Sequence, residues 1–185
     1  MNMRVITGTA RGTVLKAPEG LQTRPTADRV KEAMFSIIQF DVPAARVLDL
    51  FSGSGQLGIE ALSRGAKSAV FVDDNQKACD LIRENLRRTK LSEQGRVVRG
   101  DYQAYLRSCN EKFDIIFLDP PYAEVFLENS LIIISEIDIL QTNGIIVAER
   151  PLGKELLCDL PGFSRSRDYK YGNCVLTVYR KDDTR

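Results

Sequence analysis

Residues 47–62 read VLDLFSGSGQLGIEAL, and this stretch decides the fold. A short apolar run, Val47–Leu50, leads into a glycine-rich turn, and an amphipathic segment follows. Gly53, Gly55 and Gly58 match the spacing G-x-G-x-x-G in the strand–turn–helix context of a nucleotide-binding loop. Glycines permit the tight turn and let the backbone approach a ligand closely. The stretch therefore predicts an α/β fold with a ligand at the carboxyl end of this strand.

The chain on either side of this stretch alternates between strand and helix patterns. Strands are expected near residues 46–50, 69–73, 96–100, 113–118 and 144–149, and helices near 55–64, 75–88, 101–108 and 123–136. This alternation predicts a doubly wound, mostly parallel sheet. Residues 164–170 and 174–180 read as two further strands with a short link, so one of them must run antiparallel. We expect seven strands in total.

The first 45 residues predict a small extension on a core formed by residues 46–185, the two together making one domain. Arg4–Thr7 and Thr13–Lys16 flank a turn with two glycines and predict a β-hairpin. In the next segment, Thr26 can cap a helix whose apolar residues recur at helical spacing.

Composition narrows the class of protein. The 185 residues are 43% hydrophobic and 28% charged, which is typical of a soluble globular protein, and no apolar run reaches transmembrane length. The N-terminus lacks a signal-peptide pattern. Four widely spaced cysteines without C-x-x-C indicate reduced thiols and a cytoplasmic location. The chain has no histidine, which removes the usual general base and most catalytic zinc sites, so we expect no metal.

Two acidic residues bear on the cofactor. Asp73 ends the apolar run after the glycine loop, at the spacing where a carboxylate grips ribose hydroxyls. The loop itself fits NAD as well as another adenosine cofactor. However, Asp49 inside the first strand would repel a pyrophosphate, whereas it could anchor a cationic amino-acid moiety. This favours S-adenosyl-L-methionine (AdoMet), which carries no phosphate.

A second motif, Asp119-Pro120-Pro121-Tyr122, follows the apolar strand at 113–118. The prolines stiffen the backbone and remove two N–H donors, so bare carbonyls are presented. A carboxylate and a carbonyl beside a flat ring suit a planar group with an amine, such as a nucleobase. The same residues could form only a sharp turn, since proline and aspartate are common turn residues. Methyl transfer to a nucleobase amine accounts for both motifs together.

With these motifs the chain resembles class I AdoMet-dependent methyltransferases. More closely, it is similar to the RsmD family, bacterial 16S rRNA guanine-N2 methyltransferases. The resemblance is carried by residues 4–8, 23–35, 48–66, 119–122 and 169–172. It implies a Rossmann-like fold, AdoMet as cofactor and 16S rRNA within the assembled small ribosomal subunit as substrate. We expect a monomer that needs no membrane.

The resemblance also implies roles for individual residues. The methionine and sulfonium region of AdoMet would be lined by Asp49, Phe51, Gly53 and Gly55. The ribose would be held by Asp73, with Asp74 sharing the role, and the adenine amine would meet Asp101 and Tyr102. For Asp101, a helix N-cap is an equally common alternative. On the substrate side, the roles fall on Asp119, Pro120, Pro121 and Tyr122: the Asp119 carboxylate and the Pro120 carbonyl accept from the guanine amine, and Tyr122 stacks on the base.

Basic residues predominate in the first 46 residues and after residue 149, whereas the middle of the chain is acidic. This distribution favours contact between the flanks and a polyanion, although an ordinary solvated surface also explains so small an excess. The candidate phosphate contacts are Arg4, Arg11, Arg24 and Arg29.

Three other functions remain open. The first is an amino-methyltransferase that acts on adenine N6 or a protein glutamine amide, although those families commonly have Asn at the position of Asp119. The second is an NAD-dependent oxidoreductase, which the absence of histidine disfavours. The third is a scaffold that retains the fold without chemistry.

Overall fold

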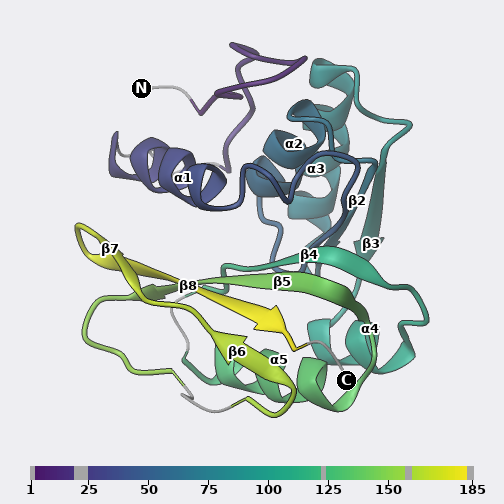
Figure 1. Ribbon diagram of the computed structural model, residues 1–185. Helices are drawn as coiled ribbons and strands as arrows, with labels where there is room; N and C mark the ends of the chain where they lie inside the picture. Colours follow the sequence, from purple (N-terminus) through teal and green to yellow (C-terminus); the bar gives the residue numbers. More distant parts are fainter. Residues whose placement is uncertain (1–2, 19–24, 122–123, 157–159, 183–185) are drawn as a thin grey trace.

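The computed structural model describes residues 3–18, 25–121, 124–156 and 160–182, and Figure 1 shows the arrangement of their helices and strands. The strands are β1 (Arg46–Asp49), β2 (Ser68–Asp73), β3 (Gly95–Arg99), β4 (Phe113–Leu118), β5 (Leu140–Pro151), β6 (Phe163–Arg165), β7 (Tyr169–Tyr171) and β8 (Cys174–Lys181). The helices are α1 (Pro25–Ile37), α2 (Gln56–Ser63), α3 (Gln76–Thr89), α4 (Tyr102–Ser108) and α5 (Glu124–Glu136).

The strands form one mixed sheet with the order β3-β2-β1-β4-β5-β8-β6, in which β7 also pairs with β8. The five strands from β3 to β5 are parallel, and β8 runs antiparallel to β5. The predicted doubly wound, mostly parallel sheet is therefore confirmed. The chain proceeds from β1 outward to β3 and then returns to β4 beside β1. The loops after β1 and β4 thus leave the sheet side by side, where such folds bind ligands.

Helices cover both faces of the sheet (Figure 1). Alternate residues of β4 face opposite layers, as the strand geometry requires. Ile115 and Phe117 belong to the layer under α1, α2 and α3, where the Phe117 ring lies 5.7 Å from that of Phe35. Ile116 and Leu118 belong to the layer under α4 and α5. Because β4 is apolar on both faces, the acidic residue that follows it stands out at the end of the strand. Among the described helices, none has the length and apolar character needed to cross a membrane.

The C-terminal part of the sheet differs from the prediction. Residues 164–170 were expected to form one strand, but two short strands, β6 and β7, pair with β8 instead, and the described residues form a sheet of eight strands rather than seven. Asp168 lies between them. Its carboxylate accepts hydrogen bonds from Arg150 at 2.6 Å, Arg165 at 2.9 Å and Thr177 at 2.8 Å. These partners hold Asp168 out of the ladder, which interrupts the strand.

The N-terminal extension is less regular than the predicted hairpin. A single bridge joins Arg4 and Val14, with backbone hydrogen bonds on either side of it. The turn packs against the end of α2, where the Thr9 N–H donates to the Ser63 carbonyl at 2.8 Å. Gly8 has φ +88°, and a Cβ there would lie 1.7 Å from the Ser63 oxygen. Only glycine fits this close approach.

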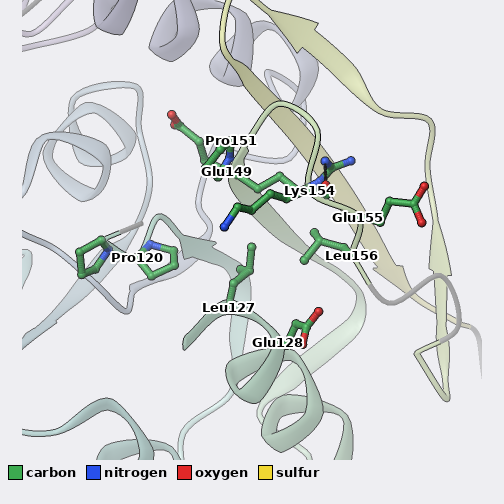
Figure 2. Close-up of a pocket in the computed structure, with 10 residues that line it drawn as sticks. Pro120, Leu127, Glu128, Glu149, Pro151, Lys154, Glu155 and Leu156 are labelled. Atoms are coloured by element: carbon green, nitrogen blue, oxygen red, sulfur yellow. Dashed lines mark hydrogen bonds between the residues drawn. The ribbon is translucent and has the colours of Figure 1, made fainter. Parts of the chain in front are cut away.

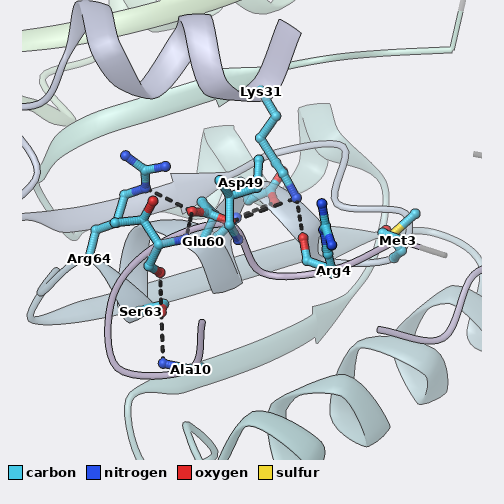
Figure 3. A network of polar contacts seen from close by, with 12 residues as sticks. Met3, Arg4, Ala10, Lys31, Asp49, Glu60, Ser63 and Arg64 are labelled. Carbon is cyan, nitrogen blue, oxygen red and sulfur yellow. Dashed lines mark hydrogen bonds and ion pairs between the residues drawn. The ribbon is translucent and has the colours of Figure 1, made fainter. Parts of the chain in front are cut away.

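A buried polar network holds the extension to the core (Figure 3). Glu60 on α2 is fully buried, and its carboxylate accepts from the backbone N–H groups of Ile6 at 2.8 Å and Thr7 at 3.0 Å. It also pairs with Arg64 at 2.8 Å and with buried Lys31 of α1 at 3.7 Å. Burial lowers the pKa of Lys31, and the nearby Glu60 charge opposes that shift. The network therefore joins α1, α2 and the extension around one carboxylate.

Asn85 on α3 connects the extension to the glycine loop. Its side-chain oxygen accepts from the Lys16 N–H at 2.8 Å, and its amide nitrogen donates to the carbonyls of Lys16 at 3.0 Å and Ser54 at 2.9 Å. Since Asn85 is fully buried, these bonds fix the loop backbone relative to the extension.

Candidate active site

Four carboxylates gather at the carboxyl edge of the sheet. Asp49 and Asp73 end β1 and β2, Asp119 follows β4, and Glu149 lies near the end of β5. Leu118 pairs with Ala148, so Asp119 and Glu149 are neighbours on adjacent strands. No ion pair between described residues involves any of the four. A cationic ligand would stabilise the charged form of carboxyl groups that lack an ion-pair partner.

Asp49 is the most enclosed of the four. It is 2% exposed, and its carboxylate accepts from the Gly58 N–H at 3.1 Å. Burial raises the pKa of Asp49 to about 7; the Gly58 hydrogen bond opposes the rise, and the Asp73 charge adds to it. A cation bound nearby would restore its charge near neutral pH.

The raised pKa of Asp49 gives a testable dependence of stability on pH. Between pH about 4 and about 7, folded Asp49 retains a proton that the unfolded chain has lost, so stability falls as pH rises through this window. Asp49→Asn removes this loss of stability, because the amide does not ionise, and its oxygen can still accept a hydrogen bond from the Gly58 N–H. The variant is expected to exceed wild type in unfolding free energy by at most about 4 kcal/mol above pH 7 and to match it near pH 4. Urea unfolding at a series of pH values measures this, and parallel curves for the two proteins would contradict it.

The glycine loop closes onto Asp73. Gly53 and Gly55 both have positive φ, +54° and +78°, which glycine adopts without strain. The Gly53 N–H donates to one Asp73 carboxylate oxygen at 2.9 Å, and the Asn75 N–H donates to the other at 2.9 Å. Each oxygen has a second lone pair, so Asp73 can still accept from ligand hydroxyls. The neighbouring Asp74 is exposed.

Asp101 and Tyr102 were expected near an adenine ring, and the ring of Phe51, expected near the methionine region, lies beside that of Tyr102. Asp101 caps α4, where it accepts from the N–H groups of Gln103 and Ala104 at 3.0 Å each. The Phe51 and Tyr102 rings lie 5.1 Å apart, and the Tyr102 ring meets that of Phe126 edge-on at 5.5 Å. The predicted alternative for Asp101, an N-cap, is thus present. Phe126 was not singled out from the sequence, because in the helical pattern it is one apolar residue among several.

The two carboxylates beside the proline pair influence each other. Burial raises the pKa of Asp119 well above its usual value, and the charges of Glu149 and Asp49 add to the rise. Burial likewise raises the pKa of Glu149, which a hydrogen bond from the Cys174 thiol opposes. The thiol pKa itself rises to about 12, mainly through burial and then through Glu149. Asp119 is therefore more basic than an ordinary carboxylate.

A pocket opens beside Pro120 and Pro121 (Figure 2). Leu127 of α5 and Leu156 supply apolar walls, and Glu149 and Lys154 supply polar groups. Tyr122 lies outside the described residues. Glu149 was not predicted as a site residue, although the tendency of ligands to bind at the carboxyl ends of strands would have indicated it. No comparable sequence signal marks Lys154, which lies in a loop.

Three of the four candidate arginines lie in the described part of the chain, and Arg4 and Arg11 occupy different places on its surface. Arg4, Arg11 and Arg29 are exposed, and Arg24 lies outside the described residues. Arg4 lies near α1, since its carbonyl accepts from the Lys31 amine at 2.8 Å. Arg11 lies in the turn packed on the end of α2, toward the opposite edge of the sheet from the four carboxylates.

In the ranges that the structure describes, no group of three acidic, cysteine or histidine side chains is arranged to hold a metal ion.

Residues 3–180 match a protein family described as "Conserved hypothetical protein 95". The chain belongs to this family. Its relatives include the Bacillus subtilis protein named "Putative rRNA methyltransferase YlbH", which is 41% identical over 97% of this chain and 99% of its own length. They also include the ribosomal RNA small subunit methyltransferase D of Haemophilus influenzae, 34% identical over 84% of this chain and 82% of its own. These matches confirm the resemblance to the RsmD family.

Solved structures agree with this family membership. The structure titled "Putative methyltransferase yhhF from Escherichia coli" is 30% identical and superposes with a TM-score of 0.88, covering 98% of this chain and 99% of its own. The class I methyltransferase fold that the motifs indicate is thereby confirmed.

Proposed function

We propose that the chain transfers a methyl group from AdoMet to the N2 amine of a guanine in small-subunit ribosomal RNA. The observation that carries the proposal is the position of Asp119 and the proline pair beside Asp49 and the glycine loop, at the switch point of the sheet. The names of the relatives support ribosomal RNA of the small subunit as the substrate. We propose further that the protein acts as a monomer on 16S rRNA within the assembled subunit.

The acidic edge fits AdoMet because the molecule carries a sulfonium and an amino-acid ammonium. AdoMet supplies an already activated methyl group, so the protein needs mainly to align the reactants and exclude water. Asp49, with the loop at Gly53 and Gly55, would hold the cationic end. Phe51 would line the methionine and sulfonium region beside the loop, Asp73 would accept from the ribose hydroxyls, and Asp101 with Tyr102 would meet the adenine.

On the substrate side, the guanine amine is a weak nucleophile because its lone pair is delocalised into the ring. Hydrogen bonds from the amine to the Asp119 carboxylate and the Pro120 carbonyl would direct the lone pair toward the methyl group. The raised pKa of Asp119 suits it to take the proton that the amine releases. The target base must be unpaired or flipped out of its stack to reach this position.

Methyl transfer from labelled AdoMet tests the proposal. The acceptors are small ribosomal subunits from a strain that lacks the endogenous enzyme, free 16S rRNA and DNA. Label recovered as N2-methylguanine in 16S rRNA is the expected result. Label on DNA or protein would support methyl transfer but contradict ribosomal RNA as the substrate. Label recovered as N6-methyladenine would contradict guanine as the target base.

Tyr122 is predicted to act through its ring. Tyr122→Ala is expected to raise KM for the RNA about 5- to 100-fold, since a base–aromatic stack contributes roughly 1–3 kcal/mol. Tyr122→Phe keeps the ring and should stay within about threefold of wild type. Steady-state kinetics on small subunits provide the measurement. Equal losses in the two variants would assign the role to the hydroxyl instead.

A further inference from the structure

Glu149 lies beside Asp119 at the carboxyl edge of the sheet. It follows Ala148, the partner of Leu118 across the β4–β5 ladder, just as Asp119 follows Leu118. Neighbouring strands are about 4.8 Å apart, so the two side chains can reach adjacent groups on one base edge. Glu149 also lines the pocket beside Pro120 and Pro121.

The Glu149 carboxylate lacks a strong donor in the described part of the chain. It forms no ion pair there, and its side-chain partner is the Cys174 thiol, which is a weak donor. Glu149 is nevertheless half-buried. A carboxylate in this situation is stabilised by a ligand that brings an N–H donor.

Hydrogen bonds of the next residue fix the chain segment that carries Glu149. The next residue, Arg150, is buried; its guanidinium donates to the Lys154 carbonyl and pairs with Asp168 at 2.6 Å. These contacts fix the start of the loop that carries Lys154. Figure 2 shows the Lys154 amine extending toward Pro120, whereas the Glu149 carboxylate extends toward the upper left of the view.

We propose that Glu149 accepts a hydrogen bond from N1–H of the target guanine and thereby selects guanine over bases whose N1 is an acceptor. Guanine presents the N1–H donor directly beside its N2 amine, whereas adenine presents an acceptor at N1. The Asp119 carboxylate and the Pro120 carbonyl accept hydrogen bonds from the N2 amine, and the Glu149 carboxylate accepts from the adjacent N1–H.

The inference rests on the proposed function, and base analogues separate the two. Small subunits are reconstituted with 16S rRNA that carries either guanosine or 2-aminopurine riboside at the target position. 2-Aminopurine keeps the N2 amine but has an acceptor at N1. Wild type should prefer guanosine by about 10-fold or more, because a buried acceptor facing an acceptor leaves both unsatisfied.

Glu149→Gln is the decisive variant, since an amide can donate to N1 of 2-aminopurine. It should methylate 2-aminopurine at least about tenfold faster than wild type does, a gain that misfolding cannot produce. Glu155→Gln is the matched control, because Figure 2 shows its carboxylate pointing away from the prolines; its preference should equal that of wild type. A wild-type enzyme that methylates guanosine while Glu149→Gln keeps the wild-type preference would overturn the inference alone. Absence of N2-methylguanine from wild-type reactions would overturn the proposed function and the inference with it.

Discussion

Asp119→Ala is expected to lower kcat roughly 100- to 1000-fold, the loss typical of removing one preorganised group that acts on the reacting atoms. The affinity for AdoMet should change by less than about threefold, because Asp49 and the glycine loop remain intact. Single-turnover methyl transfer and calorimetric titration of AdoMet measure the two quantities separately.

Asp119→Asn serves as the control for shape. The amide oxygen still accepts a hydrogen bond from the guanine amine, but the group no longer accepts a proton at neutral pH. We expect its kcat to lie between those of wild type and Asp119→Ala. If both variants retain wild-type kcat, Asp119 has no part in the chemistry.

Glu60→Leu is expected to be the most destabilising single change in the extension network. It leaves Lys31 as an uncompensated buried charge and removes the acceptor for the N–H groups of Ile6 and Thr7. Breaking a buried ion pair on one side costs about 3–5 kcal/mol. For a chain of this length, that corresponds to a fall of roughly 6–20 °C in Tm.

The double variant Lys31→Met with Glu60→Leu tests the origin of this loss. Removal of both charges eliminates the uncompensated cation, so the double variant should be more stable than Glu60→Leu alone. Thermal unfolding of the three proteins gives the comparison. An additive loss in the double variant would show that the pair is not coupled.

The alternation of strands and helices was predictable because each element has a local signal. The run at 113–118 is apolar at nearly every position, and β4 has the predicted bounds. The glycine loop was predictable as well, since positive φ at Gly53 and Gly55 is a property of those residues themselves.

Features that depend on distant partners were not predictable in this way. The break between β6 and β7 follows from the bonds of Asp168 to Arg150 and Thr177, which belong to other strands. Glu60 looks like an ordinary helix-forming residue until the extension supplies donors to its carboxylate. Glu149 likewise carries no distinguishing signal in the sequence, since its place beside Asp119 depends on the register between β4 and β5.

The anchoring of the extension has a practical consequence for labelling the protein. Met3 lies against Ser54 of the glycine loop, with 3.2 Å between the sulfur and the hydroxyl oxygen. Since β8 runs antiparallel to β5, Asp182 lies near the opposite edge of the sheet. If AdoMet binds at this loop as proposed, a bulky group attached close to Met3 would crowd its site. The same group attached close to Asp182 would lie far from the glycine loop, so this end of the chain is the better position for immobilisation.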